Sequence, residues 1–401
     1  MPESLIYFDH NATTPLHPAV WEAMRPFLID VFGNPSSLHG EGQQARDAVE
    51  EARQQVARLL GASAEEMLFT SSGTEADNLA ILGSVMAQRR QGGHIITSQI
   101  EHPAVLGSCC ALEARGFRVT RLPMGPAGTI DPDDLANALT DDTLLVTLMH
   151  ANNEVGTLQP VRECAALAHA RGVLVHTDAV QSVGKIPTLV DELGVDLLSL
   201  SGHKMHGPKG SGALYVRRGT ALDPILIGGP QEWGLRGGME HVAAIVGLGA
   251  AAQLAATRMP GEISQVAALR DRLEQAVLAA VPDVLANGAR APRLPTTTNL
   301  SFKGVDGQSL VVALDLKGVA TSTGSACSSG SLEPSHVLIA MGLSDEWLRG
   351  AVRFSLGSGN TPAQVDAVTH MLPPIVARLR QHAGGSVRHA TMTPSPIRQR
   401  A

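Results

Sequence analysis

The strongest constraint on the fold is an alternation of short apolar runs with helical segments between residues 67 and 216. Leu144–Met149 is almost continuously apolar, which is typical of a parallel strand covered by helices on both faces. Alternating strands and helices predict an α/β protein with a mainly parallel sheet. The expected strands are Met67–Thr70, His94–Ser98, Leu144–Met149, Val173–Val175, Val195–Leu200 and Gly212–Val216.

Polar residues follow these strands at the points where the strands end. Right-handed crossovers place the carboxyl ends of parallel strands at one edge of the sheet, where open α/β sheets bind their ligands. We therefore expect these residues to converge on one site. They are Thr74, His102, Asn153, Asp178, Gln181, Ser201, His203 and Lys204.

Lys204 is the most informative of these residues, because the chain contains only five lysines. A lysine just past a strand can form a Schiff base with an aldehyde if its surroundings lower the pKa of its amine. Taken alone, the loop that carries Lys204 and Lys209 is interpreted as an exposed basic turn, and only the polar residues after the other strands favour a site.

Three candidate residues lie where a helix is expected to begin. Gly73 and Thr74 open a helix whose free N–H groups form a ready anion site, although an ordinary N-cap with Glu75 explains the same residues. His102 precedes Pro103 and is either a helix cap or a residue of the ligand-binding edge.

The C-terminal part contains two residues that suggest chemistry. Cys327 lies in a Ser/Gly-rich loop, where it is either a reactive thiol, which needs exposure and flexibility, or a structural one, which is usually buried. Arg353 lies between apolar neighbours in a strand. It is either the solvent-facing alternate residue or a clamp for a carboxylate.

The length of the chain and the Pro-Gly pair at residues 260 and 261 predict two domains. One helix is expected over Val242–Met259 and another over Ile263–Val281, with Pro260 and Gly261 as the boundary between them. The expected domains are a large one over 13–259 and a smaller one over 1–12 and 260–385. The polar tail, 386–401, is expected to be disordered.

Composition excludes several classes of function. The net charge of −7, without a lysine-rich block, argues against nucleic acid as the main partner. We find no apolar run of about 18 residues and no secretory signal, so we expect no membrane segment and a cytoplasmic protein. The four cysteines lack the spacing of metal ligands, so no metal site is expected.

With these residues noted, the chain resembles a cysteine desulfurase of the nitrogen-fixation and iron–sulfur-cluster branch. That branch belongs to the pyridoxal-phosphate-dependent class V aminotransferase family. The resemblance runs from Asp9 to Gly357, and its most specific motifs are Ser201–Lys204, Gly324–Cys327 and Leu332–His336. It implies the aminotransferase-like architecture called pyridoxal-phosphate fold type I. This has a large domain with a mainly parallel seven-stranded sheet flanked by helices and a smaller α+β domain.

The resemblance also implies roles for the candidate residues. Lys204 would hold the cofactor as a Schiff base and move protons, Asp178 would pair with the pyridine nitrogen, and His102 would stack on the ring as an acid–base group. Gln181 would bind the phenolic oxygen of the ring. The cofactor phosphate would be bound by Gly73, Thr74, Ser201 and His203, and the substrate carboxylate by Asn11, Asn153 and Arg353. Asn153 would also contact the cofactor.

The implied reaction converts L-cysteine to L-alanine in a homodimer. The Cys327 thiolate would attack the substrate sulfur, and the resulting persulfide would pass to an iron–sulfur scaffold or another acceptor protein. An aminotransferase or a sulfur/selenium lyase on the same fold, and a non-catalytic partner protein, are the alternatives. The aminotransferase has no need of Cys327. Met239 departs from the family, which usually has a threonine there that binds the phosphate of the partner subunit.

Overall fold

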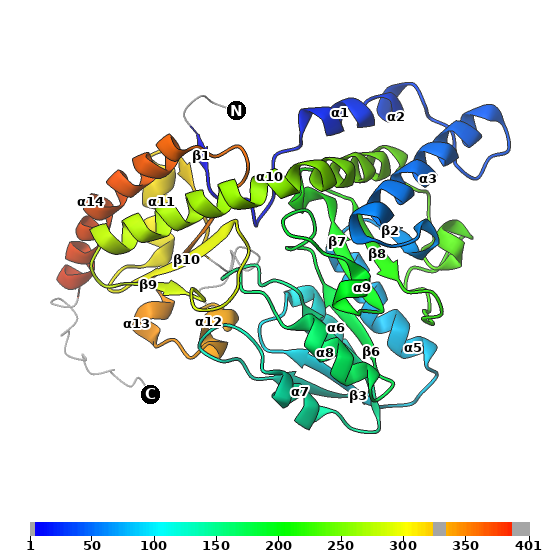
Figure 1. Ribbon diagram of the computed structural model, residues 1–401, viewed down its shortest axis with the longest axis horizontal. Helices are drawn as coiled ribbons and strands as arrows, with labels where there is room; N and C mark the ends of the chain where they lie inside the picture. Colours follow the sequence, from blue (N-terminus) through cyan, green and yellow to red (C-terminus); the bar gives the residue numbers. More distant parts are fainter. Residues whose placement is uncertain (1–4, 324–333, 387–401) are drawn as a thin grey trace, which may run out of the picture.

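The computed structural model describes residues 5–323 and 334–386. Cys327 and the tail beyond residue 386 lie outside the described residues. Figure 1 shows two parts side by side, a larger one built on a wide sheet and a smaller one built on three strands, with helix α10 running along both.

The larger part is organised around a seven-stranded sheet with the order β2-β8-β7-β6-β5-β3-β4. All neighbours in it are parallel except β8, which is antiparallel to both β2 and β7. The predicted fold class is therefore confirmed. The strands are β2 (Met67–Thr70), β3 (His94–Ser98), β4 (Arg118–Leu122), β5 (Thr143–Met149), β6 (Leu174–Asp178), β7 (Leu197–Ser201) and β8 (Gly212–Val216).

Strand β4 was missed by the sequence analysis because its pattern is not apolar. Arg118 and Arg121 alternate with Val119 and Leu122 on an edge strand, and only Leu122 is buried. An edge strand has one open side and tolerates charged side chains that a central strand would not.

Helices cover both faces of the large sheet (Figure 1). A π-helical turn over Leu79–Gly83 joins α4 to α5, so the helix that begins at Gly73 continues to Ala87. The helices of this part are α1 (Pro18–Met24), α2 (Pro26–Ile29), α3 (Gly40–Leu60), α4 (Gly73–Asn78), α5 (Ser84–Ala87), α6 (Pro103–Glu113), α7 (Pro132–Ala138), α8 (Val161–His169) and α9 (Val190–Leu193).

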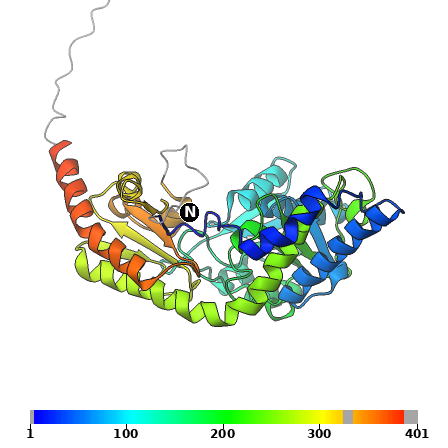
Figure 2. The same ribbon diagram turned by 90° about the horizontal axis from the view of Figure 1, so that it is seen from above.

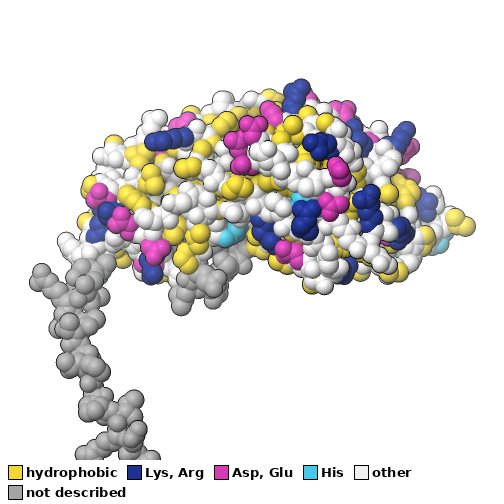
Figure 3. All heavy atoms as spheres, turned by 90° about the horizontal axis from the view of Figure 1, so that it is seen from below, with side chains coloured by type: hydrophobic (Ala, Val, Ile, Leu, Met, Phe, Trp, Pro, Cys, Tyr) yellow, Lys and Arg dark blue, Asp and Glu magenta, His cyan; other side chains and the backbone are white. Residues whose placement is uncertain are grey.

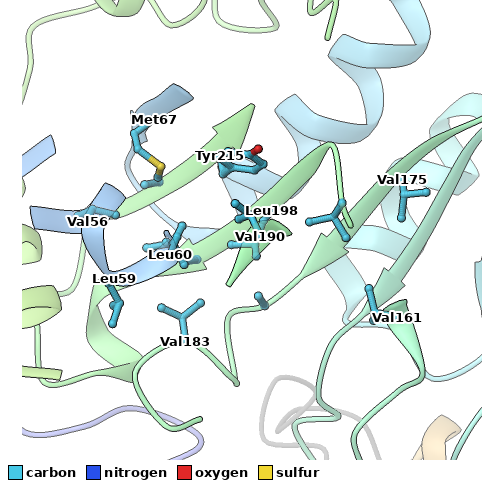
Figure 4. Packing of buried hydrophobic residues seen from close by; sticks show 14 of the residues in the cluster. Val56, Leu59, Leu60, Met67, Val161, Val175, Val183, Val190, Leu198 and Tyr215 are labelled. Carbon is cyan, nitrogen blue, oxygen red and sulfur yellow. The ribbon is translucent and has the colours of Figure 1, made fainter. Parts of the chain in front are cut away.

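The main hydrophobic core lies between α3 and the sheet. In α3, Val49, Ala52 and Val56 recur at helical spacing and are buried. Val56 and Leu60 lie near Met67 and Leu198 in the close-up of Figure 4. This packing holds the strands that end in the candidate site residues.

The smaller part contains an antiparallel sheet with the order β12-β10-β9. Phe8 comes from the N-terminal segment and is buried with Phe302 and Phe354 in a second core. The segment around Phe8 therefore packs with this part. The elements are β9 (Val284–Asn287), β10 (Thr297–Phe302), β12 (Ala351–Ser355), the pair β1 (Ile6–Tyr7) and β11 (Val319–Ala320), α11 (Gly307–Asp315), α12 (His336–Ala340), α13 (Asp345–Leu348) and α14 (Pro362–Ser386).

The two helices expected on either side of Pro260 are one continuous helix, α10 (Val242–Ala280), so the predicted break is wrong. Pro260 and Gly261 are exposed, which allows water to hydrate the carbonyl that loses its N–H partner. Figure 2 shows α10 extending along one side of both parts.

By length and composition α10 could also cross a membrane, which the sequence analysis did not foresee. It packs against α1, α3 and α14 and contributes buried residues to the core. On the face shown in Figure 3, basic and acidic side chains are interspersed.

Candidate active site

One pocket of about 370 Å³ gathers every predicted site residue that the structure describes. It lies at the carboxyl ends of β6 and β7, and it also takes residues from the N-terminal segment and from β12. Cys327 lies outside the described residues. The eleven that line the pocket are Asn11, Gly73, Thr74, His102, Asn153, Asp178, Gln181, Ser201, His203, Lys204 and Arg353.

Lys204 ends the short 3₁₀ turn Gly202–Lys204, which follows β7 directly. Its Nζ donates to the backbone carbonyls of Asn11 at 2.5 Å and of Ala12 at 2.8 Å. The exposed-turn reading of this loop is therefore wrong for Lys204, because the N-terminal segment holds its amine at the wall of the pocket.

The start of α4 forms another wall of the pocket. Ser72 caps this helix by accepting the N–H of Glu75 at 3.1 Å, as an ordinary N-cap does. Gly73 lines the pocket and packs closely against the turn after β6, since a Cβ there would lie 2.6 Å from Val180 Cγ2. The capping and the anion-binding readings of this turn are thus compatible.

Two residues of the Lys204 loop complete this end of the pocket. The Ser201 hydroxyl donates to the carbonyl of Ser211 at 3.3 Å, and His203 Nδ1 lies 3.1 Å from Thr13 Oγ1. Burial, together with the nearby lysines, lowers the pKa of His203 to about 4, so its ring is neutral at neutral pH.

Asp178 ends strand β6 and is buried. Its Oδ1 accepts the N–H of Val180 at 2.9 Å. Burial raises the pKa of Asp178, while His102 and Lys204 act in the opposite direction. A buried carboxylate in this position favours a cationic partner in the pocket.

A second buried carboxyl group, Asp77, lines the same pocket and was missed by the sequence analysis. Burial and the charge of Asp178 raise its pKa well above the usual range. Its Oδ1 has no hydrogen-bond partner among the described residues. His176 Nε2 lies 3.7 Å away, but burial lowers the pKa of His176 to about 3, so the two form no ion pair at neutral pH. The only feature of the sequence that could have identified Asp77 is its position as a carboxylate beside apolar residues of a buried helix.

His102 is both a helix cap and a residue of the pocket. It precedes α6, and its Nδ1 accepts the N–H of Ala104 at 3.1 Å. This bond requires Nδ1 to be unprotonated, so in the neutral ring Nε2 carries the proton. The cap fixes the tautomer of a ring that faces the pocket.

A network of amides lies beside Lys204. Gln181 Nε2 donates to the Asn11 carbonyl at 3.0 Å, and Lys185 Nζ donates to Gln181 Oε1 at 2.7 Å and to Asn11 Oδ1 at 3.1 Å. Lys185 was missed as a site residue, although the scarcity of lysine marked it out.

Arg353 in β12 is buried, so the solvent-facing reading is wrong. Its guanidinium donates to Asp9 Oδ1 at 2.7 Å and to the Asn153 carbonyl at 2.9 Å. It therefore reaches from the smaller part of the molecule to the loop after β5. Among the residues described, no cluster of His, Cys, Asp or Glu could hold a metal ion.

Comparison with known proteins agrees with this geometry. The model of the family "Aminotransferase class-V" matches residues 6–368. The chain is 50% identical to the cysteine desulfurase IscS of Dictyoglomus turgidum, over 94% of this chain and 95% of that protein.

Solved structures agree as well. A NifS-like protein superposes with a TM-score of 0.86 and 36% identity, covering 95% of this chain and all (100%) of the other. SspA in complex with cysteine superposes with a TM-score of 0.78 and 38% identity, covering 88% of this chain and 98% of that one. Family match, sequence identity and shared fold all cover most of the chain. The chain belongs to the class-V aminotransferase family, among its cysteine desulfurases.

Proposed function

We propose that this protein uses pyridoxal 5′-phosphate to convert L-cysteine to L-alanine and transfers the sulfur to Cys327. The observation that carries the proposal is the pocket itself. It places an amine, Lys204, a buried carboxylate, Asp178, and a buried guanidinium, Arg353, around one cavity. A cysteine complex of the related SspA supports the same substrate.

The residues present fit the cofactor. Gly73 and Ser201 suit the phosphate, because both line the pocket and Gly73 begins helix α4, whose first N–H groups have no partner within the helix. Asp178 suits a protonated pyridine nitrogen, since a cation there would offset the cost of burying its carboxylate. Bound pyridoxal phosphate withdraws electrons from the α-carbon of the substrate and so weakens the bonds around it.

Arg353, Asn11 and Asn153 are proposed to bind the carboxylate of cysteine. A planar guanidinium matches a carboxylate with two parallel hydrogen bonds. Arg353 is already oriented by Asp9 and by the Asn153 carbonyl, so little side-chain freedom is lost when substrate binds.

Lys204 and His102 are proposed to move protons at the substrate. Lys204 Nζ is held near the pocket by two carbonyl oxygens, which accept hydrogen bonds from it but cannot donate. His102 presents its Nε2 side to the pocket because Nδ1 caps α6. Each can therefore take or give a proton without losing its position.

Cys327 is proposed to receive the sulfur. Its thiolate attacks the substrate sulfur, and an S–S bond forms as the C–S bond breaks. The electron pair of the broken bond stays with carbon, which takes up a proton delivered by Lys204 or His102 to give alanine. The persulfide then passes to an acceptor protein for iron–sulfur cluster assembly. We propose a homodimer working in the cytoplasm.

The test is to incubate the protein with L-cysteine and a reductant and to measure alanine and sulfide. The wild-type protein should release both in equal amounts. Lys204→Ala should abolish both products, whereas Lys209→Ala, at an exposed lysine of the same loop, should keep them. Formation of pyruvate or of a transaminated product instead of alanine would refute the proposal.

A further inference from the structure

Lys185 lies behind the wall of the pocket, in the turns that follow β6. Gly184, just before it, has φ +78°, and a Cβ on it would lie 2.8 Å from the Cβ of Met205. This close approach places Lys185 against the segment that carries Lys204. The side chain is buried, with 9% of the residue exposed.

The Lys185 amine contacts two amide side chains and holds both. Its hydrogen bonds to Gln181 Oε1 and Asn11 Oδ1 measure 2.7 Å and 3.1 Å. Asn11 is fixed from its other side as well, because its Nδ2 donates to Thr297 Oγ1 at 2.9 Å. Lys185 thus joins the turn after β6 to the N-terminal segment.

These bonds permit one orientation of the Gln181 amide. As it stands, Oε1 accepts from Lys185 while Nε2 donates to the Asn11 carbonyl. The flipped amide would place Oε1 against that carbonyl, acceptor against acceptor, and the Gln181 N–H groups against the Lys185 N–H groups. In the observed orientation one N–H of Nε2 is bonded to Asn11, and the second remains for an acceptor in the pocket.

Among the described residues, the titratable groups that face Lys185 are basic side chains, and none of them is a carboxylate. Lys204, Arg353, His10 and His203 face it, and its acceptors in the described part of the chain are amide oxygens rather than carboxylates. Burial and the charges of Lys204 and Arg353 hold the pKa of Lys185 well below its usual range. Because both acceptors are amide oxygens, Lys185 holds them as a hydrogen-bond donor.

We propose that Lys185 is a positioning residue that fixes the Gln181 amide so that Gln181 donates a hydrogen bond to the phenolic oxygen of the cofactor. This rests on the proposed function, in which Gln181 binds that oxygen. Without Lys185 the amide loses one of the two bonds that fix it, and only the Asn11 carbonyl still opposes a flip. A flipped amide would turn its carbonyl toward the phenolic oxygen, which repels an anion instead of stabilising it.

The readout is the pH midpoint of the visible absorption band of the cofactor-loaded protein. A hydrogen bond to the phenolic oxygen stabilises its anion, so loss of that bond moves the midpoint to higher pH. Lys185→Met keeps the length and burial of the side chain but removes its donors. It should raise the midpoint by about 0.5 to 1 unit, the range that one net hydrogen bond gives.

A double-mutant cycle separates this role from a general structural one. Gln181→Leu should raise the midpoint similarly, and Lys185→Met should add nothing further in the Gln181→Leu background. Lys185→Gln retains neutral N–H donors, so its midpoint should lie closer to wild type than that of Lys185→Met. Lys317→Met makes the same chemical change at an exposed lysine of the smaller part and should leave the midpoint unchanged.

Three results would overturn the proposal. They are an unchanged midpoint in Lys185→Met, additive shifts in the double variant, and failure of both Lys185 variants to fold while Gln181→Leu folds. If Gln181→Leu leaves the midpoint in place although the wild type makes alanine, Gln181 does not bind the phenolic oxygen. The positioning role then fails while the desulfurase function stands. If the wild type makes no alanine, the proposed function itself fails.

Discussion

The guanidinium of Arg353 and the backbone carbonyl of Asn153 lie 2.9 Å apart and join the smaller sheet to the loop after β5. Asp9 holds the same guanidinium from the N-terminal segment at 2.7 Å. Three segments that are far apart in sequence thus meet at the guanidinium of Arg353, which lines the pocket. The substrate-binding end of the pocket depends on how the two parts of the molecule are joined.

Arg353→Lys should raise the KM for cysteine roughly 10- to 100-fold, because an ammonium cannot reproduce the paired hydrogen bonds of a guanidinium. The cofactor absorption should remain, since Arg353 is assigned to the substrate and not to the cofactor. Steady-state kinetics with a parallel visible spectrum measure both. An unchanged KM would contradict the assignment.

The buried carboxyl group of Glu101 should make the stability of the folded protein depend on pH. Burial raises its pKa to about 8, against 4.5 for an ordinary glutamate, although the hydrogen bond from Ser98 opposes the shift. The folded state therefore keeps a proton that the unfolded chain releases, and this group reduces stability as pH rises from 4.5 toward 8. Glu101→Gln removes that dependence.

The advantage of Glu101→Gln over wild type should grow by roughly 2–3 kcal/mol between pH 5 and pH 7. Denaturant unfolding of both proteins at pH 5, 6 and 7 measures it. Glu163→Gln, at an exposed glutamate, is the control and should track the wild type. A difference that stays constant with pH would show that Glu101 is ionised in the folded protein.

The sequence predicted the site residues that follow strands, such as Asp178 and Lys204, because parallel strands bring their carboxyl ends to one edge. Asn11 entered only through the family resemblance, and the strand around Arg353 left its role open, since nothing local shows that an N-terminal turn and a distant strand reach the same pocket. Asp77 and Lys185 were not predicted, because their roles arise from burial beside other site residues. The sequence analysis ended a helix at Pro260, but the helix continues through it. Pro260 is exposed, which lowers the free-energy cost of a proline inside a helix.

Arg53 and Glu232 form a buried ion pair that should be important for stability. Both Glu232 oxygens accept from the guanidinium at 2.8 Å, and Trp233 stacks on it. Glu232 itself has φ +47°, an uncommon conformation for a residue other than glycine, and this pair holds it in place. Arg53→Met should destabilise the protein by about 3–5 kcal/mol, because it leaves Glu232 buried and unpaired.

The matched control for this prediction is Arg218→Met. Arg218 and Glu65 form a surface pair whose side chains are 74% and 77% exposed, so its loss should cost about 0–1 kcal/mol. Thermal or denaturant unfolding measures both variants. An equal loss of unfolding free energy in the two variants would show that the buried pair stabilises the fold no more than the surface pair.

Met239 should weaken binding of the cofactor phosphate in the proposed homodimer. Its side chain is 60% exposed, and a thioether cannot donate the hydrogen bond that the family threonine supplies. Met239→Thr should lower the Kd for pyridoxal phosphate about tenfold, as a hydrogen bond to a charged group does. Met239→Val has the shape of threonine without the hydroxyl and should not. Equal affinities of the two variants would count against a role in phosphate binding.

The central claim is that sulfur leaves cysteine through Cys327. The most direct test compares alanine and sulfide production from L-cysteine by wild type and by Cys327→Ser, with a reductant present. We predict equal amounts of both products from the wild type, and neither from the variant, whose visible cofactor absorption remains. Full activity in Cys327→Ser would contradict the claim and favour an aminotransferase or lyase reaction in the same pocket.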